Sequence, residues 1–184
     1  MRLVLPSSLS GVSSPCRPYD PALDDVGSVL RDVCEALETA GVGFKVRIGS
    51  SDSWPTTTRT DLLVVMEQLT FVLGALLANQ ACRLDFCEQG VERLVSLTPK
   101  EDAIVVECTD LIKKTSSRIQ TMTLPRNVVA DELVGLGDDF LRVANICCAE
   151  LVGHPWFLAW MRELQRNSEK LRSPSFIPRD HPLR

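Results

Sequence analysis

The stretch LDFCEQGVERLVSLTPKEDAIVVECTD, residues 84–110, decides the fold. Apolar and polar side chains alternate along it, and a period of two is typical of a β-strand with one buried face. Glu-Gln-Gly at 88–90 and Pro-Lys-Glu-Asp at 99–102 interrupt the alternation with turn-forming residues, and Gly90 can adopt the positive φ of a tight hairpin. We therefore predict an antiparallel meander with strands at 82–88, 91–98 and 103–109.

The same alternation assigns the faces of these strands, because successive side chains point to opposite sides of a sheet. Asp85 is predicted to point outward, since Leu84 and Phe86 occupy the inner face on either side of it. The outer face then carries these further residues: Arg83, Cys87, Val105, Glu107 and Thr109, while Ile104 and Val106 point inward.

The segments that flank the meander predict further strands and helices. Alternating FKVRI at 44–48 and RIQTMTL at 118–124 are expected to be strands. Apolar residues recur at helical spacing from Leu23 to Leu37 and again from Val128 to Val152. The GLG at 135–137 weakens the second of these helices and predicts a break in it.

A long apolar run from Thr60 to Ala78 predicts the central helix, with Thr60 as its N-cap and Asp61 in its first turn. Such a helix is expected to be buried on all sides. A last helix opens at Pro155 and carries two tryptophans. The fold class is therefore α+β, with an antiparallel four- to five-stranded sheet packed on a long buried helix and on the C-terminal helices.

Length and composition favour one domain, since 184 residues with 45% apolar side chains can build a single core. We expect that domain at 21–171. Residues 1–20 read as a flexible lead-in, and the Pro-rich 172–184 as a flexible arm.

Charge and targeting signals narrow the function classes. A net charge of −4 and a pI near 5.2 lack the basic surface that nucleic-acid binding requires. The LVLP near the start is shorter than the apolar core of a signal peptide, and LLVVMEQLTFVLGALLA contains Glu67 and falls short of the roughly 20 residues that cross a bilayer. We expect a cytoplasmic protein that binds neither nucleic acid nor membrane.

The seven cysteines include no C-x-x-C pair, and only His154 and His181 could complete a metal site. We predict neither a disulfide nor a metal, because cysteine in a reducing compartment packs as a small apolar residue. No Gly-rich phosphate loop is present, and no cofactor is predicted.

Two catalytic arrangements can be built from the sequence. Cys87 or Cys108 could act as a nucleophile with His154 as its base. Alternatively, carboxylates held close together at the hairpin end of the sheet would repel one another. This repulsion could raise the pKa of one of them enough for general acid/base catalysis. The carboxylates in question are Asp85, Glu88 and Glu92, and the competing interpretation is a solvated hairpin in which Arg83 and Arg93 are their cross-strand partners.

The hairpin phrase DFCEQGVE, the long apolar helix before it and the HPWFLAW at 154–160 after it resemble a group of small bacterial proteins with a D-F-x-E-Q-G-x-E hairpin. This group is associated with the immunity proteins of polymorphic or contact-dependent toxin systems. The similarity extends over residues 54–160, with Cys87 at a position where the group suggests an aromatic residue.

The resemblance implies a non-catalytic protein that neutralises a cognate toxin by covering the toxin's active site. The motif residues Asp85, Glu88, Gln89 and Glu92 would then contact the partner, because an acidic hairpin complements a basic groove. Two alternatives stay open: a cytosolic enzyme or small-ligand-binding protein that uses a carboxylate pair or a cysteine, and a homodimeric structural or regulatory subunit.

Overall fold

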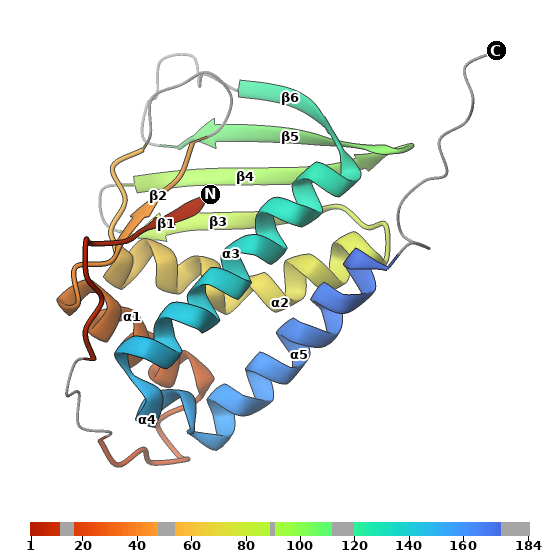
Figure 1. The fold of residues 1–184 in the computed structure, drawn as a ribbon. Helices are drawn as coiled ribbons and strands as arrows, with labels where there is room; N and C mark the ends of the chain where they lie inside the picture. The colour runs from red at the N-terminus through yellow and green to blue at the C-terminus, as the bar shows by residue number, and fades with distance from the viewer. Residues whose placement is uncertain (12–16, 48–53, 89–90, 112–119, 174–184) are drawn as a thin grey trace.

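The structure is a computed structural model that describes residues 1–11, 17–47, 54–88, 91–111 and 120–173. A four-stranded antiparallel sheet forms one layer, and helices pack against one of its faces (Figure 1). The predicted α+β class is therefore confirmed.

The sheet is a meander in which each strand pairs with its neighbour along the chain, in the order β3-β4-β5-β6. The register places Leu84 opposite Val95, and Val95 opposite Cys108. The three central predictions were close, although β4 continues two residues past the expected end through Pro99. The bounds are β3 (Cys82–Glu88), β4 (Val91–Lys100), β5 (Ala103–Asp110) and β6 (Gln120–Pro125).

The inner face of the sheet supplies part of the hydrophobic core, as the alternation predicted. Leu84, Phe86 and Ile104 are fully buried, and Val106 is nearly so. An antiparallel sheet with one face on the core and the other in solvent gives this pattern of burial along each strand.

A second, two-stranded sheet pairs β1 (Arg2–Val4) with β2 (Gly43–Lys45). Leu3 lies opposite Phe44, and both side chains belong to the core. This differs from the expectation that residues 1–20 form a flexible lead-in. The run LVLP is too short to show strand periodicity, and the pairing joins segments about forty residues apart, so only tertiary contacts identify it.

The central helix begins as a π-helical turn, η1 (Thr58–Leu62), and continues as α2 (Leu63–Leu77). Its N-cap is Thr57 rather than the predicted Thr60, and the Asp61 carboxylate accepts a hydrogen bond of 2.7 Å from the Thr57 N–H. Asp61 is almost completely buried, with 3% of its surface exposed. A π-helical turn closes its hydrogen bonds over five residues instead of four. The helix therefore begins at a different residue from the one that α-helical spacing predicts.

The burial of α2 is less complete than predicted. Phe71 is 68% exposed, although the helix contacts β3, α1, α3 and α5. The continuous helix from Thr58 to Leu77 has 20 residues and a mean hydropathy of 1.6, so by length and composition it reaches the size of a membrane span, which corrects the shorter estimate from the sequence. Just over half of it, 56%, is buried inside the protein, as in the core helix of a folded domain.

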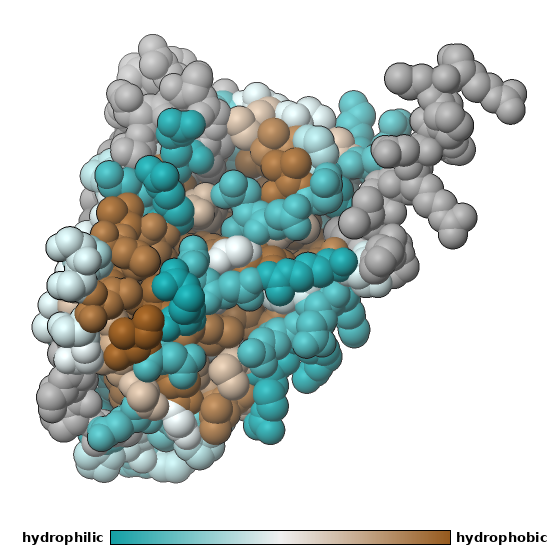
Figure 2. Space-filling view, viewed as in Figure 1, coloured by the Kyte–Doolittle hydropathy of each residue, from teal (hydrophilic) through white to brown (hydrophobic). Residues whose placement is uncertain are grey.

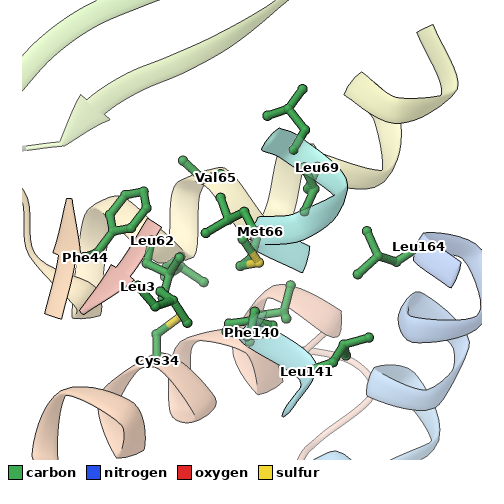
Figure 3. Packing of buried hydrophobic residues seen from close by; sticks show 14 of the residues in the cluster. Leu3, Cys34, Phe44, Leu62, Val65, Met66, Leu69, Phe140, Leu141 and Leu164 are labelled. Carbon is green, nitrogen blue, oxygen red and sulfur yellow. The ribbon is translucent and has the colours of Figure 1, made fainter. Parts of the chain in front are cut away.

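Four further helices complete the layer. Leu23, predicted at the start of the first, lies outside it and is 85% exposed, because Asp25 caps the helix by accepting from the Ser28 N–H. Figure 3 shows Met66 of α2 lying over Phe140 of α3, with Leu164 of α5 nearby. The helices are α1 (Val26–Thr39), α3 (Arg126–Cys147), α4 (Ala149–Val152) and α5 (Pro155–Arg172).

The predicted break at GLG does not occur, since α3 is continuous from Arg126 to Cys147. Gly137 is buried, and a Cβ there would lie 3.2 Å from Leu164 Cδ2 and 3.3 Å from Leu69 Cδ2. Gly137 thus allows α3 to approach α2 and α5 closely. At Gly135 a Cβ would meet nothing within 4 Å.

This difference between two neighbouring glycines gives a prediction. Gly135→Ala is expected to raise the free energy of unfolding by about 0.5–1 kcal/mol, because alanine loses less backbone entropy in a helix and has open space at this site. Gly137→Ala is expected to lower it, because the new methyl group crowds two buried leucines. Denaturant unfolding of the two variants measures both effects, and equal changes would contradict the assigned packing.

Candidate functional site

The outer sheet face is the surface of the four-stranded sheet opposite the helices. None of its described side chains is buried, in contrast to the inner face. The register places Asp85 opposite Leu94 and Leu94 opposite Thr109 in one row across the strands. The described residues of the face are Arg83, Asp85, Glu92, Leu94, Ser96, Thr98, Lys100, Ala103, Val105, Glu107, Thr109, Thr121, Thr123 and Pro125.

Three carboxylates and two cations lie on this face, so it has a net negative charge. Glu92 and Glu107 are exposed and Asp85 is half-buried, while Arg83 on β3 and Lys100 at the end of β4 are the described cations of the outer sheet face. Between these charges lie the half-exposed apolar side chains of Leu94 and Val105. Protein interfaces have an apolar centre and a polar rim, so this arrangement is compatible with a protein partner.

The backbone of Asp85 is fixed by the central helix. The Gln68 side chain accepts from the Asp85 N–H at 3.0 Å and donates to the Asp85 carbonyl at 3.0 Å. The Gln68 amide therefore occupies the place that a further strand would take beside β3. No role was predicted for Gln68 from the sequence, since nothing local to it indicates a contact 17 residues away.

The four predicted contact residues are only partly described. Asp85 and Glu92 both lie on the outer sheet face, on adjacent strands near the hairpin. For Glu88 the structure describes the backbone, which pairs with Val91, and Gln89 lies outside the described residues. Asp85 and Glu92 are thus the described part of the candidate site.

Arg93 does not have the predicted role of partner to the outer carboxylates. It lies opposite Phe86 and Asp110, which places it on the inner side of the sheet. Its guanidinium stacks on the Trp54 ring at 4.5 Å, and its Nε lies 3.6 Å from an Asp110 carboxylate oxygen. The period of two explains the correction, because Arg93 immediately follows the outward-facing Glu92.

Trp54 is a residue to which the sequence analysis assigned no role. It is 7% exposed and makes an edge-to-face contact with Phe86, with ring centroids 5.4 Å apart. Trp54 and Phe86 thereby support the hairpin end of the sheet from the inner side. An isolated tryptophan before a proline gives no signal of this partner, because the contact depends on the register of β3.

The structure does not assemble the cysteine and histidine dyad that includes Cys108. Cys108 is buried on the inner face of β5, and burial raises the pKa of its thiol, which disfavours the thiolate that nucleophilic attack requires. His154 caps α5 by accepting from the Trp156 N–H at 3.3 Å, and its ring lies against Tyr19. β5 and the start of α5 lie on opposite sides of the molecule (Figure 1). The side chain of Cys87 lies outside the described residues.

The described ranges also contain His, Cys, Asp and Glu side chains away from the outer sheet face. Among those residues no group of three or more His, Cys, Asp or Glu side chains could hold a metal ion. The five cysteines that the structure describes are free thiols: Cys34, Cys82, Cys108, Cys147 and Cys148.

Comparison with known proteins gives no family for this chain: no family model, no curated protein and no solved structure matches it.

Proposed function

We propose that this protein is a non-catalytic binding module of the immunity-protein type, which captures a basic protein toxin through its outer sheet face. The observation that carries the proposal is a sheet face whose described side chains all stay at least partly exposed, with Asp85 and Glu92 beside half-exposed Leu94 and Glu107 beside half-exposed Val105. The hairpin between β3 and β4, with Glu88 and Gln89, would form one border of this site.

Charge supports the choice of a basic partner. The outer sheet face has more carboxylates than cations, and the whole chain carries a net charge of −4. Complementary charge accelerates encounter with a basic groove and disfavours acidic partners. The apolar side chains between the charges would supply the desolvated centre of the interface.

Rigidity supports the choice of this face. Gln68 holds β3 from its edge, while Phe86 and Trp54 pack beneath the hairpin end. A preformed surface loses little conformational entropy when it binds, which favours a tight inhibitory complex. In this proposal the protein acts in the cytoplasm and needs no cofactor.

We expect a toxin domain to be encoded next to the gene, and the test measures the binding of that domain to the purified protein. Glu92→Gln combined with Glu107→Gln is expected to slow association roughly 3- to 10-fold at low salt and to weaken its dependence on salt, because both carboxylates steer the encounter. Stopped-flow association rates across a salt series measure this. Asp85 stays unchanged because its backbone is bonded to Gln68.

The matched control removes the same charge elsewhere. Glu163 and Glu169 are exposed on α5, and changing both to glutamine should leave the association rate close to that of the wild type. Equal effects of the two double variants would show that only net charge matters and would refute docking on the outer sheet face. Thermal melts of both variants confirm that the fold is intact.

A further inference from the structure

The two edges of the four-stranded sheet differ. At the middle of the β3 edge, the Gln68 side-chain amide bonds to the Asp85 peptide group. At the other edge, β6 pairs with β5 on one side, and none of the described residues pairs with its other side. Every second residue of an edge strand directs its N–H and C=O away from the sheet, so β6 presents unpaired backbone groups to an incoming strand.

The sequence of β6 does little to prevent such pairing. Proteins commonly protect an edge strand with lysine, other charges, proline or a bulge. The strand QTMTLP contains no charged residue, and its proline is at the last position. β6 is therefore compatible with an incoming strand along most of its length.

Apolar side chains lie next to this edge on the helical side of the sheet. Met122 and Leu124 pack against the core but are only half-buried, and Val128 in the first turn of α3 is 40% exposed. Figure 2 shows apolar surface in this region, near β6 and the beginning of α3. The core is thus incompletely covered at the β6 edge.

We propose that a second copy of this chain pairs with β6 and extends the sheet across a two-fold axis. An axis perpendicular to the sheet makes the two β6 strands antiparallel and keeps both helical layers on the same side. With Thr123 at the axis, Met122 of one copy lies opposite Leu124 of the other, and the two half-covered apolar regions meet.

Symmetry is the reason for choosing a second copy as the occupant. In a two-fold strand pair, a charged residue near the axis meets the same charge from the other copy, which disfavours pairing. β6 has no charge, and its inner side chains are apolar at both positions that would face each other. The same edge therefore complements itself, and the outer sheet faces of the two copies stay accessible.

Sedimentation velocity over a concentration series tests this interface. The wild type is expected to shift from the 20.4 kDa monomer towards a dimer as concentration rises. Thr123→Lys should raise the dimer dissociation constant by roughly fivefold or more at low salt, because two lysines then face each other at the axis. Thr123→Glu should act in the same direction for the same reason.

Two further samples decide whether the effect belongs to the β6 edge. An equimolar mixture of Thr123→Lys and Thr123→Glu should restore dimers, because opposite charges then meet at the axis. Thr98→Lys is the matched control, since Thr98 is an exposed threonine of the same row on the outer sheet face but lies on β4. It should leave the dimer unchanged.

A wild type that stays monomeric at all concentrations would overturn the proposal. So would a dimer that Thr123→Lys and Thr98→Lys weaken equally, or a mixture of the two Thr123 variants that stays monomeric. Toxin binding enters none of these measurements, so the β6 interface and the proposed function can fail independently.

Discussion

Phe86→Ala is expected to lower the free energy of unfolding by about 3–5 kcal/mol, the largest single effect anticipated for this protein. The Phe86 side chain is fully buried on the inner face of β3 and contacts the Trp54 ring. Its loss would leave a cavity between the sheet and the loop that carries Trp54. For a chain of this size, each kcal/mol corresponds to about 2–4 °C in melting temperature, so a thermal melt resolves the change readily.

Phe71→Ala is the matched control for that prediction. Phe71 is 68% exposed on α2, so its truncation removes little buried surface, and alanine has the higher helix propensity. The melting temperature should change by no more than a degree or two, which corresponds to about 0.5 kcal/mol. A larger loss of melting temperature from Phe71→Ala than from Phe86→Ala would contradict the exposed position of Phe71 on α2 and the buried position of Phe86 on β3.

Gln68→Leu is expected to lower the free energy of unfolding by about 1–3 kcal/mol, although leucine is apolar and of similar size. The change removes both hydrogen bonds to the Asp85 peptide group and the bond of 2.8 Å from Gln68 to the Val64 carbonyl. The Asp85 N–H and C=O would then face an apolar side chain. Denaturant unfolding measures the loss.

Gln165→Leu provides the comparison for Gln68. Gln165 is exposed on α5, so the same chemical change there should alter stability by less than about 0.5 kcal/mol. Hydrogen exchange adds a local readout: the Asp85 amide should exchange faster in Gln68→Leu and at the wild-type rate in Gln165→Leu. Unchanged exchange at the Asp85 amide in Gln68→Leu would contradict the two hydrogen bonds between Gln68 and the Asp85 peptide group.

The elements that could be predicted from the sequence are those with local signals. The three strands between residues 82 and 110 alternate clearly and are joined by short turns, so both their faces and their pairing follow from the neighbouring sequence. β1 could not be found in this way, because three residues contain too little periodicity and their partner lies about forty residues away. Likewise the GLG in α3 looks like a break until Leu69 and Leu164 are seen to pack against Gly137.

The candidate site shows the same division. Alternation alone placed Asp85 and Glu107 on the outer sheet face. The interpretation that made Arg93 a cross-strand partner of the outer carboxylates was wrong, because Arg93 lies opposite Phe86 and Asp110 on the inner side. Two further contacts depend on tertiary packing: Arg93 stacks on Trp54, and Gln68 hydrogen-bonds to the Asp85 peptide group. Local sequence patterns do not predict such contacts. The partner contacts of the Glu88 and Gln89 side chains stay a prediction.

The meander also has a consequence for the order in which the chain folds. Each of its strands pairs with the next strand along the chain, so forming the sheet closes only short loops and costs little chain entropy. Docking α5 on α2 is different, because it joins Asn167 to the Thr70 carbonyl across 97 residues. Contacts of low sequence separation generally form early in folding. We therefore expect the sheet and α2 to form the folding nucleus, and α5 to close the core over them in a later step.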